Sequence, residues 1–318
     1  MLKKRLFIYL PFLLFVILFA VGTTKDLEIA AGIGIWHGWL LQGLVALLPL
    51  LGACSLAYYA GITLGVRLCL KSVFLRIVFI ILAVGSFAVA VYFGQNEMAS
   101  EGGLDLGRSG KVIGIAVSLI LCLLFAWRGT VRGRANTDPN LWIIVLFVIG
   151  LTAAVILVTV AAKLFIHRPR FLYLVNGQTP LTVDDFCRWY QSSPMYKLVD
   201  GPDGLFKSFP SGHMALTVVL CLQWPVLCSL QRPKRGNKPN KPRFFCKKNI
   251  PAVYILSLVI ALVTGFVRML CGAHFLSDVS FPAMLFYAMF IIAYEVYLNK
   301  FDREEPLVCA KNQVKEIN

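Results

Sequence analysis

Three short polar stretches stand at the ends of very apolar segments, and their residue types fit a phosphate site. They are 163–170 (KLFIHRPR), 209–213 (FPSGH) and 268–278 (RMLCGAHFLSD). Between them they hold three of the chain's four histidines, together with lysine, arginine and aspartate side chains. Ionisable groups are costly near a bilayer, so their recurrence at membrane boundaries indicates a function.

The third stretch contains a histidine and an aspartate at helical spacing. His274 and Asp278 are four positions apart, so on a helix they would share one face and could form a hydrogen bond. A carboxylate that binds one imidazole nitrogen leaves the other nitrogen able to attack, which is how a histidine nucleophile is prepared. We therefore predict that His274 is a nucleophile oriented by Asp278.

The second stretch has the residues of a helix start. Ser211 is a good N-cap, and Gly212 lets an anion approach the backbone closely. The N–H groups and the dipole at a helix start favour a phosphate, with His213 beside it. The alternative is a simple helix cap followed by a surface histidine.

The first stretch supplies fixed positive charge. Lys163 and Arg170 are seven positions apart, although Pro169 is expected to end the helix before Arg170. An arginine can bind a phosphate through two hydrogen bonds, and Arg268 of the third stretch adds another guanidinium. Alternatively, Lys163 extends to the membrane interface and Arg168 with Arg170 is an ordinary juxtamembrane pair.

The elements that carry these stretches are membrane helices. The chain of 318 residues is 58% hydrophobic and 15% charged, with a mean hydropathy of +0.74, which is typical of a polytopic membrane protein. We therefore predict an all-α bundle of about eight transmembrane helices, each needing about 20 residues. The apolar runs lie near 6–22, 38–62, 73–94, 112–128, 141–163, 213–230, 250–267 and 279–298.

The distribution of charge predicts which ends of the helices are cytoplasmic. Lys3, Lys4 and Arg5 precede the first span, which at about 17 apolar residues is longer than a signal-peptide core, so we expect a retained anchor. With this end inside, roughly two thirds of the lysines and arginines are cytoplasmic, as the positive-inside rule requires. The net charge of +15 therefore needs no nucleic acid partner. We predict that both termini and the 232–248 loop are cytoplasmic and that the three polar stretches lie on the other side.

One long loop, 171–208, is predicted on the outer side. Thr182 and Asp185 have the spacing of a capping box, which suggests a short interfacial helix whose aromatic residues face lipid. This segment is either a lid or lipid-entry wall, or a packed surface loop. The aromatic residues concerned are Phe186, Trp189 and Tyr190.

The cysteines and carboxylates do not suggest a metal site. No CxxC pair occurs, and the outer side has no carboxylate cluster suited to Mg²⁺. Cys187 and Cys271 both fall on the outer side, where a disulfide between them is possible.

Taken jointly, the three stretches closely resemble the type 2 phosphatidic acid phosphatase superfamily. Its signature is K-x6-RP, then PSGH, then SR-x5-H-x3-D. Lys163 and Arg170 fit the spacing of the first motif, and residues 210–213 match the second motif. The spacing of the third motif is matched by Arg268, His274 and Asp278. The resemblance implies a transmembrane hairpin at 1–66, a six-helix phosphatase core at 67–300 and a cytoplasmic tail at 301–318.

The resemblance also implies roles for the individual residues. His274 would form a phosphohistidine, Asp278 would orient it, and His213 would be the general acid that protonates the leaving oxygen. Family members work without a metal, so we expect no cofactor. The groups implied to hold the phosphoryl oxygens are Lys163, Arg170, Ser211, Gly212 and Arg268.

Two positions depart from the family pattern. Phe171 replaces a proline and Val267 replaces a serine, which puts substrate positioning and rate in question. The function implied is a membrane phosphatase acting on a lipid such as polyprenyl diphosphate, phosphatidate or phosphatidylglycerol phosphate. The alternatives are a phosphoryl transferase that uses another lipid or a sugar as acceptor, and a non-catalytic lipid-binding protein or transporter.

Overall fold

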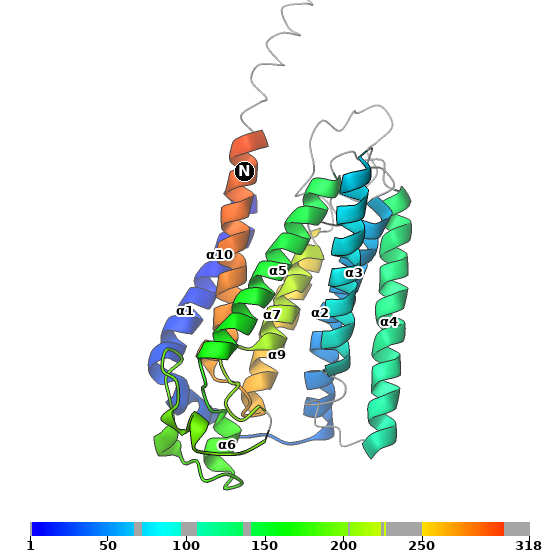
Figure 1. Cartoon of the computed structure of the whole chain (residues 1–318). Coiled ribbons are helices and arrows are strands. Elements are labelled where there is room, and N and C mark those ends of the chain that lie inside the picture. The colour runs from blue at the N-terminus through cyan, green and yellow to red at the C-terminus, as the bar shows by residue number, and fades with distance from the viewer. Residues whose placement is uncertain are drawn as a thin grey trace, which may run out of the picture.

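The computed structural model is a bundle of long helices with one region of irregular loops at its lower end (Figure 1). It describes residues 2–66, 72–96, 107–135, 141–202, 204–223, 226 and 250–301. The helices are α1 (Leu2–Ile33), α2 (Trp39–Val66), α3 (Val73–Asn96), α4 (Gly107–Ala135), α5 (Leu141–Phe165), α6 (Phe171–Val175), α7 (Gly212–Val218), α9 (Ile250–Leu270) and α10 (Leu276–Phe301), with short 3₁₀ turns η3 (Val183–Asp185), η4 (Pro194–Lys197) and η5 (Val219–Leu222).

The fold confirms an all-helical, multi-pass membrane protein. Seven helices within the described residues are long and apolar enough to cross a membrane: α1, α2, α3, α4, α5, α9 and α10. The remaining predicted span, 213–230, begins as α7 and η5 and is described up to Gln223 and at Val226. The predicted cytoplasmic loop 232–248 and most of the tail at 301–318 lie outside the described residues.

The first helix is longer than predicted. Its predicted span ended near residue 22 because polar residues follow, but the helix continues to Ile33. Lys25 is exposed and forms an ion pair with Glu28 at 2.8 Å. Asp26 points the other way and is only 4% exposed. The helix therefore continues through its charged turn because one charge faces outward and the other has partners inside the protein.

Helices α2 and α4 are packed almost backbone to backbone. Gly61 and Gly65 on α2 face Gly129 and Gly133 on α4, in the small-xxx-small arrangement of membrane helix pairs. A Cβ atom on Gly61 would lie 1.9 Å from the carbonyl oxygen of Ala126, so only glycine fits there. Helix α2 also contacts α3, α5, α7 and α9, whereas α1 packs along α10.

The three polar stretches meet at one end of the bundle. There α5 and α9 finish, and α7 and α10 begin, while the N-terminus lies at the opposite end (Figure 1). The backbone N–H of Ser211 donates to the carbonyl of Asp278 at 2.9 Å, and the Lys163 ammonium donates to the carbonyl of Lys207 at 3.0 Å. The long connections of the fold thus bring distant parts of the sequence into direct contact.

The predicted outer loop is mostly irregular. The capping box between Thr182 and Asp185 is present, but it starts only the single turn η3. Phe186 packs edge-on against Phe275 at 5.2 Å instead of turning toward lipid, and Trp189 stacks on Phe209 at 5.5 Å. The prediction of an interfacial helix is therefore wrong: Phe186 and Trp189 pack onto the end of the bundle, whereas Tyr190 is 51% exposed.

Candidate active site

A cavity of about 290 Å³ lies between α3, α5, α7 and the loop that precedes α10. One part of its wall is polar and combines residues from all three sequence motifs. The ionisable residues of this part and the glycine beside them are Lys163, Arg170, Lys207, Gly212, His213 and His274. Residues separated by more than 100 positions therefore share one small volume.

His274 is oriented by a backbone carbonyl group. It lies in the loop before α10, and its Nδ1 atom is 2.6 Å from the carbonyl oxygen of Ser208. The nearest oxygen of Asp278 is 3.8 Å away, too far for a hydrogen bond. The prediction that His274 and Asp278 share a helix face and bond directly is therefore wrong. A carbonyl only accepts, so Nδ1 carries a hydrogen, and in the neutral imidazole Nε2 then keeps its lone pair.

The surroundings of His274 favour its neutral form. The side chain is 2% exposed, and burial lowers the pKa of His274 well below its ordinary value. The positive charges of Arg268 and Lys163 lower this pKa further, whereas Asp278 opposes them. A neutral imidazole with an available Nε2 is the form that can act as a nucleophile.

Asp278 supports this arrangement from behind the imidazole. It is fully buried in the first turn of α10, and its carboxylate accepts from the Ser208 hydroxyl and from the backbone N–H of Phe275 at 2.8 Å. Ser208 therefore bridges the pair: its hydroxyl donates to Asp278 while its carbonyl accepts from His274. The carboxylate acts on the imidazole through Ser208 and through its charge.

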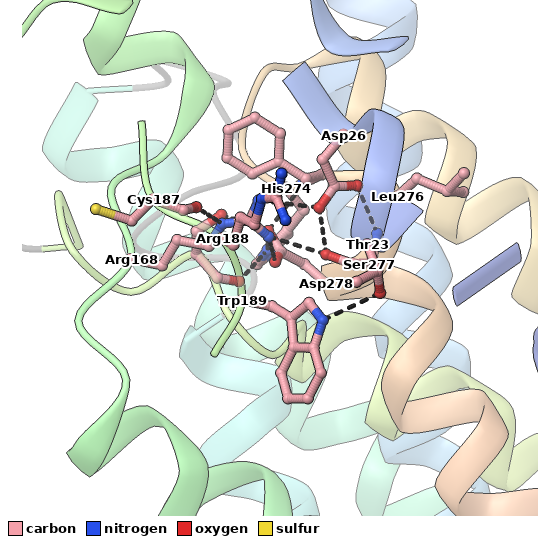
Figure 2. Close-up of polar contacts among 12 residues, drawn as sticks. Thr23, Asp26, Arg168, Cys187, Arg188, Trp189, His274, Leu276, Ser277 and Asp278 are labelled. Carbon is pink, nitrogen blue, oxygen red and sulfur yellow. Dashed lines mark hydrogen bonds and ion pairs between the residues drawn. The ribbon is translucent and has the colours of Figure 1, made fainter. Parts of the chain in front are cut away.

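Arg168, interpreted from the sequence as an ordinary juxtamembrane residue, is wholly buried beside Asp278 (Figure 2). Its NH1 atom donates to Asp278 and to the Ser277 hydroxyl, its NH2 atom donates to Asp26, and its Nε donates to the carbonyl of Cys187 at 2.8 Å. Nothing in the motif spacing distinguishes this arginine from its neighbours. The signal is the set of four partners, which come from three separate parts of the chain.

The guanidinium of Arg168 also contacts two aromatic rings, which pack against each other. It lies 4.1 Å from the ring centre of Phe275 and 5.1 Å from that of Phe186. Such cation–π contacts are strongest away from water, as here. They add to the hydrogen bonds that hold the guanidinium beside the Asp278 carboxylate.

His213 lines the same cavity as His274. It lies in the first turn of α7, and Ser211 caps this helix by accepting from the N–H of Met214 at 3.4 Å. The ring centres of His213 and His274 are 6.3 Å apart and the rings are inclined at 63°, so the two imidazoles lie side by side in the wall of one cavity. Beside them, a Cβ on Gly212 would meet no described atom within 4 Å, so the space next to its backbone is open.

The predicted phosphate-binding residues divide into two sets. Lys163, Arg170 and Gly212 line the cavity, as does Lys207, which the motifs did not include. Arg268 and Ser211 are buried and are not among the residues that line the described cavity. Arg268 contributes its charge near His274, and Ser211 caps α7.

The two departures from the motif pattern are buried. Phe171 begins α6 and packs edge-on against Phe275 at 6.1 Å, and Val267 is 3% exposed near the end of α9. Neither residue lines the described cavity. Cys187 and Cys271 are both free thiols, so the possible disulfide between them is not formed.

The fold and this cavity define a polytopic membrane protein in which two histidines and several cations meet at the end of a helix bundle. The family model of the PAP2 superfamily matches residues 141–302, just over half of the chain. The protein therefore belongs to the PAP2 superfamily. No curated protein and no solved structure matches the chain significantly. The matched segment includes all three motifs, and α1 to α4 precede it.

Proposed function

We propose that the protein is an integral-membrane phosphatase that hydrolyses a lipid phosphate or diphosphate through a phosphohistidine. The observation that carries this proposal is that one cavity has two imidazoles and three cationic side chains at one end and an apolar wall at the other. Membership of the PAP2 superfamily supports the same reaction class.

The apolar part of the wall fits a lipid substrate. It is formed by side chains of α3, α5 and α7, which are bundle helices. Tyr92 in this wall is 62% exposed, so the cavity borders the outer surface of the bundle, where lipid would lie. A lipid could place its phosphate among the cations while its chains stay against apolar side chains, of which the main ones are Tyr92, Phe93, Ile156, Val160 and Leu216.

The proposed reaction has two steps. Nε2 of His274 attacks the phosphorus, the bond to the leaving oxygen breaks, and His213 donates a proton to that oxygen. Water then attacks the phosphohistidine while His213 accepts its proton, which releases inorganic phosphate and restores His274. Positive charge near the phosphoryl oxygens stabilises the transition state, and Lys163, Arg170 and Lys207 supply it.

We further propose that the site faces the extracytoplasmic side and that both termini are cytoplasmic. The motivation is the excess of basic residues on the side of the N-terminus. Single-cysteine variants of a protein without native thiols test this orientation. One cysteine replaces Asp200, on the loop near the site, and the other replaces Arg134, at the end of α4 far from the site. An impermeant thiol reagent added to intact cells should label position 200 and not position 134, and the reverse would contradict the orientation.

One observation favours a transferase as the second candidate. A separate cavity of about 410 Å³ adjoins the first, and the two share Lys163 and Lys207. Its wall also contains His167, stacked on Tyr196 at 3.5 Å, and Asp200, which could hold a polar acceptor. In this case the phosphohistidine would pass its phosphoryl group to an acceptor hydroxyl in place of water.

Phosphate release by the purified full-length protein tests the proposal. The substrates are phosphatidate, phosphatidylglycerol phosphate and a polyprenyl diphosphate in detergent micelles, with His274→Ala as the matched control. We expect release from at least one substrate by the wild type and none by the variant. Folded wild-type protein that releases no phosphate from any of them, or a variant that equals it, would contradict the proposal. Loss of substrate phosphate that requires an added lipid or sugar acceptor would identify a transferase.

A further inference from the structure

Asp26 of α1 is buried against the site although it lies outside the matched family segment. Its carboxylate accepts from the backbone N–H of Ser277 at 2.9 Å, from the Ser277 hydroxyl, and from NH2 of Arg168 at 2.9 Å (Figure 2). Ionised carboxylates accept several hydrogen bonds of this kind, including one from a guanidinium. Asp26 therefore belongs to the same polar network as Asp278.

The backbone of α1 is close to α10 at this turn. A Cβ on Gly22 would lie 2.5 Å from the backbone nitrogen of Ser277, so a side chain at this position would push the helices apart. Trp189 of the outer loop donates from Nε1 to the Thr23 hydroxyl at 3.0 Å (Figure 2). One face of α1 is thus fixed to α10 and to the outer loop, which gives Asp26 a defined position.

We propose that Asp26 is a positioning residue for the reaction, acting through Arg168 and Ser277 on Asp278 and thereby on His274. This inference rests on the proposed function. The two carboxylates share one guanidinium, with NH1 bound to Asp278 and NH2 bound to Asp26. Asp26 holds Arg168 in a position where the guanidinium binds the Asp278 carboxylate. Because Arg168 also pairs with Asp26, its positive charge is shared and does not fully neutralise Asp278.

Charge at Asp26 has a predictable effect on His274. The charged groups that act on His274 are Asp278, Arg268 and Lys163, and Arg170, Lys207 and His213 line the same cavity. Most of these are cations, and Asp26 acts on them through Arg168. Without the Asp26 carboxylate, the guanidinium would be balanced by Asp278 alone, which weakens the negative charge that Asp278 sets against the cations around the imidazole. The protonated form of His274 would then be less stable, so its pKa would fall. The phosphohistidine would also be less stable, because its ring carries positive charge too.

The test compares two substitutions on α1 that remove the same charge. Asp26→Asn keeps an oxygen that can accept from Ser277, and Glu28→Gln neutralises an exposed carboxylate paired with Lys25. For phosphatidate hydrolysis by the full-length protein, we expect Asp26→Asn to lower kcat by about 10- to 100-fold, the usual range for partners behind a reacting group. The acid limb of kcat/KM should move to lower pH, while Glu28→Gln matches the wild type in both.

A second comparison tests whether the effect passes through the arginine. In an Arg168→Gln background, Asp26→Asn should lower kcat much less than it does in the wild type, because the shared guanidinium is gone. Full additivity of the two substitutions would overturn the proposal. So would an Asp26→Asn variant that melts at a lower temperature but keeps the wild-type kcat and pH profile, because this would show a structural role only.

A measurement that does not depend on turnover separates this inference from the proposed function. Wild-type protein that releases no phosphate would contradict the proposed function. The role of Asp26 can then still be tested by following the titration of His274 in ¹⁵N-histidine NMR spectra. The chain has only four histidines, so histidine-to-glutamine variants can assign them. We expect Asp26→Asn to lower the pH at which His274 titrates and Glu28→Gln to leave it unchanged. Identical His274 titrations in the wild type and Asp26→Asn would overturn the inference.

Discussion

The Nδ1–H group of His274 donates to the backbone carbonyl of Ser208 at 2.6 Å. A backbone carbonyl cannot be removed by a side-chain substitution, so the tautomer of the imidazole is fixed by the fold itself. Asp278, 3.8 Å from the same nitrogen, is left to supply charge and to hold Ser208 and Arg168 in place. This division of roles leads to separate expectations for the residues around His274.

Asp278→Asn should reduce activity without abolishing it, because Ser208 still orients His274. The larger effect should be on stability, since breaking a buried ion pair costs about 3–5 kcal/mol. Unfolding in detergent and single-turnover phosphate release measure the two effects, with Asp184→Asn on the exposed turn η3 as the control. A variant with wild-type stability and no activity would show that Asp278 instead bonds His274 directly during the reaction.

Conservative substitutions of the two neighbouring arginines should have different effects. Arg168 is wholly buried and its planar group reaches four acceptors, which a lysine cannot do, so Arg168→Lys should destabilise the fold by about 3 kcal/mol. Arg170 lines the cavity, so Arg170→Lys should mainly raise KM and should lower the melting temperature less. Thermal unfolding and steady-state kinetics of the two purified variants measure these effects. Equal losses of stability would contradict the assignment of Arg168 to the network behind the site.

The acid limb of kcat/KM should lie well below pH 6.5, the ordinary value for histidine. Burial lowers the pKa of His274, and the charges of Arg268 and Lys163 lower it further, so we expect the proposed nucleophile to stay neutral in mild acid. Lys163→Gln removes one positive charge and should move this limb to higher pH, whereas Lys197→Gln on the turn η4, where the side chain is exposed, should not. An unchanged limb in Lys163→Gln would contradict this account of the charge around His274.

The same pKa shift has a consequence for stability. Because the pKa of His274 is lower in the folded protein than in the unfolded chain, the unfolded chain binds the extra proton first. As the pH falls below about 6.5, this histidine therefore favours unfolding. The free energy of unfolding should therefore fall less in His274→Gln than in the wild type when the pH is lowered from about 6.5.

The contact between α2 and α4 should not tolerate a side chain. Gly61→Ala would place a methyl group 1.9 Å from the carbonyl oxygen of Ala126, and we expect a loss of about 2 kcal/mol or more in stability. Gly43→Ala on the same helix meets no described atom within 4 Å and should be neutral or slightly stabilising. Unfolding of both variants in the same detergent is the measurement. Similar stabilities would contradict the close packing.

Hydropathy predicted most of the fold because lipid imposes a simple rule on length and polarity. Helices α2, α3 and α5 begin within one residue of the predicted apolar runs and extend a few residues beyond their predicted ends. The rule failed at α1, where Lys25 and Asp26 look like the end of a span. Their opposite orientations on the helix, one toward the exterior and one into the site, cannot be read from hydropathy alone.

Motif spacing predicted most of the charged residues of the cavity, but it also predicted Arg268 and Ser211, which do not line it, and it missed Lys207. Lys163, His213 and His274 do share one cavity. Ser208 was missed because it acts through its backbone carbonyl, and every residue has one. Arg168 was missed because its partners come from α1, the outer loop and α10, which only the folded chain brings together.

We assign His274 as the nucleophile and His213 as the proton donor and acceptor, and a rapid-quench experiment can separate these two roles. An activated aryl phosphate needs little protonation of its leaving oxygen, so His213→Ala should still form the phosphohistidine but hydrolyse it slowly. We predict that this variant accumulates an acid-labile, alkali-stable phosphoryl group located on His274, and that His274→Ala accumulates none. A phosphoryl group on His274→Ala, or none on a His213→Ala variant that still turns over the aryl phosphate, would contradict the account.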